Sequence, residues 1–386
     1  MFYKIDPELL GGVAILQNEF YVDAIVYYSD NSIIKKIIGE YKVQILGEYP
    51  FIKAVAVRVN KQNIFDLASN LGVRYVAKVA GAQIMMDKSR KIINVDELHR
   101  ANINGKGINI AIIDTGCYPH LDFVLGKNRI IKFVDFINER TSTYDDNGHG
   151  TFVAGVLAGN GLVANAKFCG IAPNSGLVIL KALKNDGQTQ AYKVLEAMQW
   201  VFDNHKKYNI RVVCMSFGST PLAQNDPLSV GANALWQKGI VVVSAVGNDG
   251  PLKSSVKSPG SSAKIITVGS ADTTSNELKV ADFSSRGPIF DFIKPDLIAP
   301  GVGITATSND TKFYRQMSGT SVSTPFVAGV AALLLQKNPL LLPNDIKTIL
   351  LASTTKLPFD ANECGAGLLN AKNSNIFVDK ILNKTR

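Results

Sequence analysis

Three separated segments of the 386-residue chain place a carboxylate, an imidazole and a hydroxyl where each could take part in chemistry. Asp114 follows the near-continuous apolar run 108–113, His149 stands between two glycines, and Ser321 precedes the apolar run 326–335. A serine hydroxyl becomes a nucleophile when a base such as histidine lies beside it, and a carboxylate can orient that base. Each residue alone also has an ordinary interpretation: Asp114 as a helix N-cap or a Mg²⁺ ligand, and Ser321 as a cap on a buried helix.

The histidines limit the choice of base, because the chain contains only 4. His205 stands beside two lysines, and His99 lies in a short polar segment typical of a helix. His120 lies near Asp114 in the sequence, within a proline-containing loop, and is the one rival to His149.

Two patterns indicate how these residues are held. The apolar run before Asp114 is typical of a strand buried on both faces in a parallel sheet, and open α/β sheets carry their chemistry at the carboxyl ends of such strands. Pro325 fits the first turn of a helix, so we expect Ser321 at a helix N-terminus. Free N–H groups and the positive end of the helix dipole would there favour a developing oxyanion. The fold class predicted for this part is therefore α/β.

A smaller unit precedes the segments that carry these residues. Its apolar periodicity predicts strand, helix, strand, strand, helix and strand over residues 21–29, 31–41, 42–47, 51–59, 61–71 and 76–86. This βαββαβ order is the ferredoxin-like split motif. The charged residues 88–91 mark a boundary, so we predict that the small domain ends near residue 86.

Composition excludes several classes of function. The net charge is +9, but the lysines are scattered without an aromatic-interleaved basic patch, so we expect no nucleic-acid partner. No apolar run of membrane-spanning length and no basic-then-apolar leader occurs, and the 4 cysteines lack CxxC spacing. These features predict a cytoplasmic protein in a reducing compartment, with no membrane partner.

The motifs around the three residues resemble those of one family. Residues 114–116 (Asp-Thr-Gly), 149–151 (His-Gly-Thr) and 319–321 (Gly-Thr-Ser) are similar to the signature segments of the subtilisin-like serine proteases (subtilases, peptidase family S8), in that family's order. The similarity extends through most of residues 93–369, and it is strongest to the intracellular AprX-type group.

The resemblance implies a domain plan. It predicts a subtilisin-like three-layer α/β fold with a mostly parallel central sheet, preceded by a small ferredoxin-like prodomain. We accordingly expect a prodomain over residues 1–86, a catalytic domain over 87–375 and a C-terminal tail over 376–386.

The resemblance also implies an activity, serine endopeptidase hydrolysis through an acyl-enzyme. Ser321 would attack the scissile carbonyl, His149 would take its proton, and Asp114 would hold the imidazole. Asn248 would donate to the oxyanion. A catalytically silent pseudoprotease with a binding or regulatory role is the alternative, and an esterase is disfavoured because the Gly-x-Ser-x-Gly elbow is missing.

Substrate polypeptides would bind extended between two edges, the segments 216–218 and 186–189. The substrate-binding residues implied are Ser216, Phe217, Gly218, Ala245, Val246, Gly247, Gly187 and Gln188. Lys257 departs from the small residue expected near the pocket floor. It could narrow the pocket, favour an acidic group or point outward.

Three further residues depart from the family pattern or lie near the triad. Phe152 and Phe326 stand where many subtilases have histidine, and we expect a packed aromatic pair behind the triad. Cys117, three residues after Asp114, is expected to be buried and inert.

The small domain gains a role from the resemblance, as an intramolecular inhibitor of a zymogen. We expect self-cleavage within residues 83–88, leaving residues near 81–86 product-like in the cleft. No cofactor is expected to be required, and no metal ligand belongs to the site itself. One structural Ca²⁺ stays open, with Asp122 as a ligand that the resemblance suggests.

Overall fold

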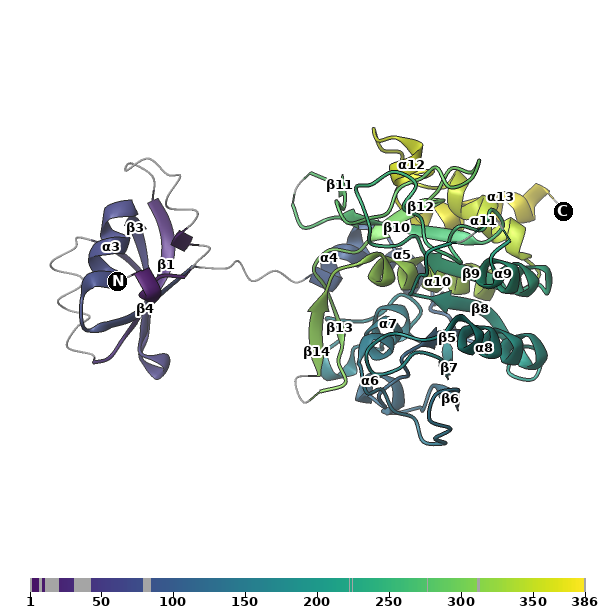
Figure 1. Ribbon diagram of the computed structural model, residues 1–386, viewed down its shortest axis with the longest axis horizontal. Helices are drawn as coiled ribbons and strands as arrows, with labels where there is room; N and C mark the ends of the chain where they lie inside the picture. Colours follow the sequence, from purple (N-terminus) through teal and green to yellow (C-terminus); the bar gives the residue numbers. More distant parts are fainter. Residues whose placement is uncertain are drawn as a thin grey trace. The chain divides into compact units, whose positions relative to one another are not determined.

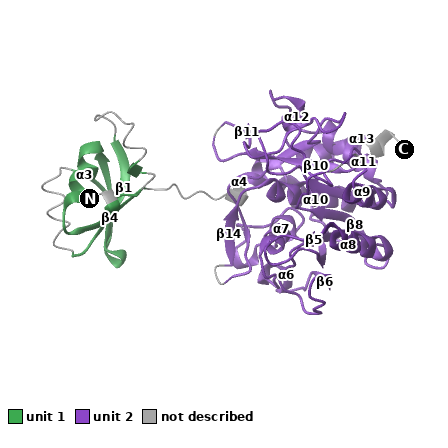
Figure 2. Cartoon of the chain, viewed as in Figure 1, with its two compact units in different colours: residues 1–83 green, residues 84–386 purple. Residues whose placement is uncertain are grey.

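The computed structural model describes residues 2–6, 9–10, 21–30, 43–78, 85–221, 223, 225–275, 277–310 and 313–384. The chain divides into two compact units, Met1–Gln83 and Ile84–Arg386 (Figures 1 and 2). This division falls just before residue 86, where the charged segment predicts a boundary.

The first unit is a small antiparallel sheet with a helix. Its strands follow the order β2-β3-β1-β4, with antiparallel pairing throughout. Asn60 caps α3 by accepting a 2.9 Å hydrogen bond from Asn63 N, and Ile64 and Leu67 of that helix are buried. Its elements are η1 (Phe2–Lys4), β1 (Tyr21–Tyr28), β2 (Gln44–Tyr49), η2 (Pro50–Ile52), β3 (Ala54–Asn60), α3 (Lys61–Ser69) and β4 (Val73–Lys78).

Two predictions for this region have different outcomes. The helix predicted over residues 31–41 lies outside the described residues, so the βαββαβ order stays a prediction. The strand predicted over 76–86 is wrong at its end, because β4 stops at Lys78 and Met85 begins helix α4 (Met85–Ile92). The sequence of α4 is rich in Met, Lys and Arg, which are good helix formers.

The second unit is built on an eight-stranded sheet with the order β11-β10-β9-β8-β5-β7-β6, and β12 pairs with β10. All the pairings are parallel except the one between β10 and β11. The strands are β5 (Asn109–Asp114), β6 (Ile130–Asp135), β7 (Gly176–Lys181), β8 (Ile210–Met215), β9 (Val241–Ala245), β10 (Ile266–Asp272), β11 (Lys279–Val280) and β12 (Leu297–Pro300). A separate hairpin joins β13 (Ile304–Thr307) to β14 (Tyr314–Met317).

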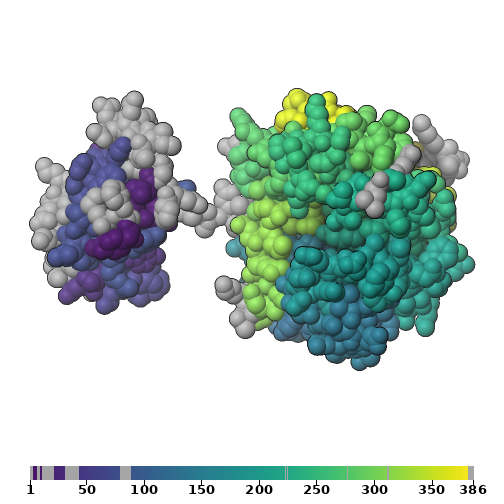
Figure 3. Space-filling model, in the orientation of Figure 1, coloured from purple at the N-terminus to yellow at the C-terminus, as the bar shows by residue number. Residues whose placement is uncertain are grey.

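Helices cover both sides of this sheet, which gives the predicted three-layer α/β fold. Helices α7 and α10 pack against each other, as do α8 and α9, and each pair contacts the sheet (Figure 1). The helices of this unit are α4, α5 (Asp96–Arg100), α6 (Leu121–Val124), α7 (His149–Ala158), η3 (Leu162–Ala164), α8 (Ala191–Asn204), α9 (Pro227–Gln237), α10 (Thr320–Lys337), α11 (Pro343–Ala352), α12 (Ala361–Cys364) and α13 (Ala371–Lys384). In the space-filling view, the first half of this unit, in blue and teal, and its second half, in green, form one continuous face (Figure 3).

Helix α10 is the central helix of the core. Its residues are buried from Val322 to Leu335, as expected for a helix that is apolar all round. The sequence predicts Pro325 in the first turn of this helix. This prediction is wrong, because the helix begins at Thr320 and Pro325 lies beyond its first turn. Gly319, at the N-cap, starts the helix instead.

The prediction of a C-terminal tail that begins at residue 376 is also wrong. Residue 376 lies inside α13, and Val378 of that helix is fully buried in the core of the second unit. An amphipathic helix that buries one face explains why this segment packs onto the unit rather than leaving it. Among the described residues, no helix is both long enough and apolar enough to cross a membrane.

Candidate active site

The site lies where several parallel strands end. Asp114 is the last residue of β5, and the segments 216–218 and 246–248 follow β8 and β9 directly. Since β9, β8 and β5 are neighbours in the sheet and run parallel, their carboxyl ends meet at one edge. The sheet therefore gathers three of the segments that the sequence singles out.

Asp114 and His149 form a hydrogen-bonded pair. His149 Nδ1 lies 2.8 Å from Asp114 Oδ1, which also accepts a 2.7 Å bond from Thr115 N. Asp114 is fully buried, whereas the His149 side chain is 21% exposed. The imidazole is therefore held on its Nδ1 side by a buried carboxylate, which leaves Nε2 for a reacting group.

The pKa of His149 is raised above its ordinary value of 6.5, although burial opposes this shift. Desolvation by burial is the largest single influence and lowers the pKa, but the negative charge and hydrogen bond of Asp114, with the charge of Asp145, outweigh it. The pair thus stabilises the imidazolium form that a general base must pass through.

Asp145 fixes the first turn of α7, which begins at His149. Its Oδ1 accepts from Gly148 N at 2.7 Å and from Asn147 N at 3.1 Å. Its Oδ2 accepts from Thr151 N at 2.8 Å and from Thr151 Oγ1 at 2.6 Å. Gly148 has a φ of 97°, which favours glycine, so the chain turns sharply into the helix just before the histidine.

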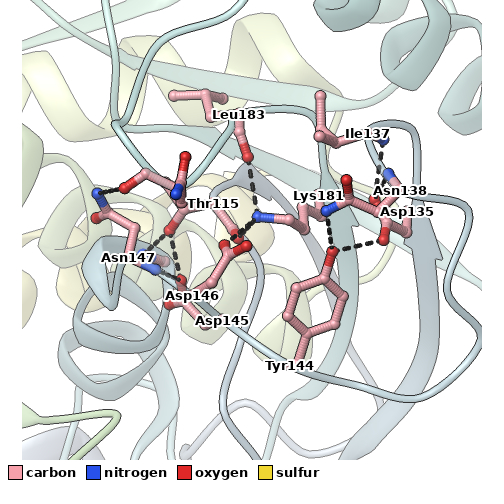
Figure 4. A network of polar contacts seen from close by, with 12 residues as sticks. Thr115, Asp135, Ile137, Asn138, Tyr144, Asp145, Asp146, Asn147, Lys181 and Leu183 are labelled. Carbon is pink, nitrogen blue, oxygen red and sulfur yellow. Dashed lines mark hydrogen bonds and ion pairs between the residues drawn. The ribbon is translucent and has the colours of Figure 1, made fainter.

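A second polar network continues from Thr115 to β7 and β6 (Figure 4). The buried Lys181 ends β7 opposite Asp114, and its Nζ donates to Thr115 O and Asp146 Oδ1, both at 2.6 Å, and to Leu183 O at 3.1 Å. Its ammonium also lies 5.1 Å from the centre of the Tyr144 ring. Lys181 therefore ties the segment after Asp114 to the segment before His149.

Tyr144 extends this network to the end of β6. Its hydroxyl donates to Asp135 Oδ2 at 2.7 Å and accepts from Asn138 Nδ2 at 2.7 Å (Figure 4). Desolvation by burial, together with the Asp135 carboxylate, raises the pKa of Tyr144 to about 12. The pKa of Asp135 is lowered: burial opposes this, but the backbone N–H groups and the Tyr144 hydroxyl that it accepts from outweigh burial.

Asn248 and Ser321 meet beside Gly319. Asn248 Oδ1 accepts from Thr320 N and from Thr320 Oγ1, both at 2.9 Å. Because a backbone N–H can only donate, the amide oxygen must face Thr320, and the amide NH₂ faces away from it. A Cβ placed on Gly319 would lie 3.1 Å from Ser321 Oγ and 3.5 Å from Asn248 Nδ2. A donor and a hydroxyl therefore flank the same glycine.

Ser321 is the second residue of α10 and is partly exposed. Its own N–H belongs to the first turn, where no intrahelical acceptor exists. In the part of the chain that the structure describes, no hydrogen bond joins Ser321 Oγ to the His149 ring. Ser321 lies in the first turn of α10 and His149 begins α7, and these two helices pack against each other.

A cavity of about 260 Å³ lies between the two edges predicted to bind substrate. Gly187 and Gln188 border one side, and Phe217 and Gly218 border the other. Apolar side chains, among them Leu183, Val194 and Leu228, line it as well. The two predicted edges thus face a common hollow.

His120 is not a second base at this site. It is 1% exposed, and its Nδ1 accepts from Asp122 N at 3.0 Å. Its ring packs against those of Phe123, Phe313 and Tyr314 at 5.4 to 5.9 Å. Desolvation by burial lowers its pKa. His120 is therefore a buried, neutral core residue.

The residues around Asp122 do not fit a calcium ion. Both carboxylate oxygens accept from protein donors, Oδ1 from Val163 N at 3.1 Å and Oδ2 from the Tyr314 hydroxyl at 2.8 Å. Calcium needs six to eight oxygen ligands, and a backbone N–H cannot be one. Among the described residues, no three His, Cys, Asp or Glu side chains gather where they could hold a metal.

Phe152 and Phe326 are both fully buried, on the packed helices α7 and α10. Cys117 is fully buried as well, and desolvation raises its pKa well above the ordinary value, so the thiol stays protonated. Burial at the three positions fits the packing roles that the sequence predicts, and a direct contact between the two phenylalanine rings stays a prediction.

Asp145 and Lys181 are the site residues that sequence reasoning misses. One signal was present for Lys181, because a lysine directly after four apolar residues of a buried strand needs partners. Asp145 carried a weaker signal, as the first of two acids before an Asn-Gly pair at a helix start.

Comparisons with known proteins agree with this geometry. A family model described as the subtilase family matches residues 105–367. The chain is 35% identical over 364 residues to the serine protease AprX of Bacillus subtilis, covering 87% of this chain and 82% of that protein. It is 30% identical to a thermostable alkaline protease of Halalkalibacterium halodurans, with coverages of 86% and 85%. A solved structure of a cold-adapted subtilisin-like serine proteinase matches with a TM-score of 0.59 and 30% identity, over 70% of this chain and 90% of that one.

Proposed function

Since the chain belongs to the subtilase family of serine proteases, we propose that Asp114, His149 and Ser321 form its catalytic triad. The 2.8 Å contact between the buried Asp114 carboxylate and His149 Nδ1 supports this proposal most directly. Helix packing supports the third member, because Ser321, in the first turn of α10, and His149, at the start of α7, belong to two helices in contact.

Peptide hydrolysis then proceeds in two halves. Ser321 Oγ attacks the carbonyl carbon while its proton moves to His149 Nε2, and the carbonyl oxygen becomes an oxyanion. Collapse of this intermediate breaks the C–N bond, and the leaving amine takes the proton from His149. Water repeats the attack on the acyl-enzyme, with His149 as base, and frees Ser321.

Asn248 is the proposed donor to the oxyanion. Its amide oxygen is already fixed by Thr320, so its NH₂ is oriented before substrate arrives. The Ser321 N–H, which has no intrahelical acceptor in the first turn of α10, is the second donor. Donors that need no reorganisation stabilise the oxyanion more than mobile ones do.

Polypeptide substrates would lie extended between residues 186–189 and 216–218. The cavity bordered by Gly187, Gln188, Phe217 and Gly218 would take an apolar substrate side chain. Ser216, Ala245, Val246 and Gly247, which follow or end β8 and β9, would form the wall next to the scissile bond.

The first unit would act as prodomain and intramolecular inhibitor, removed by self-cleavage within residues 83–88.

The start of α4 bears on where this cut would fall. Within residues 83–88, α4 begins at Met85, and Lys88 Nζ donates to Thr274 O at 3.1 Å. Proteases of this kind cut extended chain, so the cut is expected at the start of the window, and α4 stays with the second unit. Residues 81–84 lie outside the described residues. Met85 and Met86 are helical in the uncut chain, so they would have to leave α4 to become product-like in the cleft.

Intact mass and peptide hydrolysis over time, compared with Ser321→Ala, test the proposal. The wild type should lose the first unit and then hydrolyse peptides, whereas the variant should do neither. If the wild type stays intact and hydrolyses nothing, the protease proposal is wrong and the pseudoprotease alternative gains.

A further inference from the structure

Lys257 has its backbone fixed between the two segments that would wall the substrate pocket. Its N–H donates to Val246 O at 2.8 Å, on the segment after β9. The next residue, Ser258, exchanges two backbone hydrogen bonds of 2.8 and 2.9 Å with Ser219, on the segment after β8. The direction of the Lys257 side chain is therefore set by backbone contacts on both sides.

The lysine stem fills the space between two glycines. A Cβ on Gly218 would lie 2.6 Å from Lys257 Cβ, and a Cβ on Gly247 would lie 2.6 Å from Lys257 Cγ. Such distances are closer than packed carbon atoms approach, so glycine is needed at both positions for the lysine to fit. The side chain is 22% exposed, which excludes the alternative that it points outward into solvent.

The charge of this lysine is already paired. Its Nζ lies 2.5 Å from Asp249 Oδ2 and 3.2 Å from Thr220 Oγ1. Asp249 directly follows Asn248, the proposed oxyanion donor, in the chain. An acidic substrate group would have to displace Asp249 to gain this ammonium.

The space between Gly218 and Gly247 is distinct from the 260 Å³ cavity, which Lys257 does not line. We propose that this space is the pocket for the residue whose carbonyl is cleaved, and that Lys257 and Asp249 together set its specificity. The stem makes the pocket shallow and the ion pair makes it neutral, so the enzyme prefers a small, uncharged residue such as alanine there. This inference rests on the proposed protease function and names its substrate class.

The test uses three peptides that differ only at that residue, which is alanine, phenylalanine or glutamate. kcat/KM is measured for the wild type, Lys257→Gly, Lys257→Met and Asp249→Asn. Lys253→Met is the control, because Lys253 is an exposed lysine of the same loop. Lys257→Ala replaces the glycine variant where the latter loses its native circular dichroism spectrum.

We expect the wild type to favour alanine over both other residues. Lys257→Gly opens the pocket and should raise the phenylalanine-to-alanine ratio by roughly tenfold or more. Lys257→Met keeps the stem volume and should leave that ratio low. Asp249→Asn frees the ammonium and should raise the glutamate-to-alanine ratio by about tenfold. Lys253→Met should change neither ratio.

Two results would overturn the inference in different ways. In the first, the wild type cleaves after phenylalanine as well as after alanine, and Lys257→Gly has the same phenylalanine-to-alanine ratio of kcat/KM. This result refutes the pocket assignment but leaves the protease function standing. Hydrolysis of none of the three peptides by the wild type or any variant contradicts both proposals.

Discussion

Thr115 Oγ1 donates a 2.9 Å hydrogen bond to Asp145 Oδ1, and it accepts one of 2.9 Å from Gly150 N. Thr115 follows Asp114, and Gly150 follows His149. The neighbours of the carboxylate and of the imidazole are thus bonded to each other, independently of the contact between the two side chains. This arrangement makes the geometry of the pair depend on Asp145, which touches neither substrate nor the reacting atoms.

Asp145→Asn should therefore impair both folding and catalysis. The replacement turns one acceptor oxygen into an NH₂ that faces donors, and each buried group left unsatisfied costs about 1–3 kcal/mol. We expect a loss of that size in the free energy of unfolding, measured in urea, and a lower kcat. Asp203→Asn, on the exposed side of α8, should change neither.

The pH dependence of kcat/KM should report on the Asp114–His149 pair. Because His149 acts as a base only when neutral, activity should rise with pH through a midpoint above 6.5, the direction in which Asp114 moves its pKa. Asp114→Asn removes that influence, so its midpoint should fall, and its kcat should fall roughly 10⁴-fold. A midpoint that does not move would contradict the pairing.

The same pKa shift has a consequence for stability. A raised folded-state pKa means that the folded protein holds the His149 proton more tightly than the unfolded chain does. This contribution is fully present below the unfolded pKa and is lost as the pH rises through the folded one. The wild type should therefore lose more stability over that range than Asp114→Asn.

Sequence alone predicts the parts of the proposed site that are encoded locally. Asp114, His149 and Ser321 each stand in a short segment whose glycines and apolar neighbours set its own conformation. The side chains of Asp145 and Lys181 both bond to Thr115, which lies 30 and 66 residues away from them in the chain, so only the tertiary fold brings those groups together.

Errors at the ends of elements have a similar cause. Pro325 is tolerated beyond the first turn because α10 is held by burial on all sides, which local propensity does not register. The segment from residue 376 reads as a tail until Val378 is seen to pack in the core. In both segments, burial against elements distant in the chain determines the structure, and local sequence does not show that burial.

Lys181→Met should destabilise the second unit. The change removes a buried donor that serves Thr115 O, Leu183 O and Asp146, and it leaves the two carbonyls without that donor. We expect a loss of roughly 2–4 kcal/mol in the free energy of unfolding, since each unsatisfied buried acceptor costs about 1–3 kcal/mol. Lys206→Met, at an exposed position, is the control, and equal stabilities for the two variants would contradict the role of Lys181.

Asn248→Ala should lower kcat with little change in KM, because its amide is expected to contact the substrate oxygen only as charge develops. Losing one such donor costs roughly 10²–10³ in kcat. Asn128→Ala, at an exposed position, should have no effect. A raised KM with unchanged kcat would show that Asn248 binds the ground state instead.

Gly319→Ala should abolish activity while the fold survives. Gly319 has φ 154° and ψ 160°, a conformation that only glycine adopts readily. The added methyl group would lie 3.1 Å from Ser321 Oγ and 3.5 Å from Asn248 Nδ2, so it would take the space between nucleophile and oxyanion donor. Gly126→Ala separates this effect from backbone strain, because Gly126 has φ 79° but open space around its Cβ position. Both variants should lose about 1–3 kcal/mol of stability in urea unfolding, but only Gly319→Ala should lose kcat. Equal activities in the two variants would place the reacting carbonyl elsewhere.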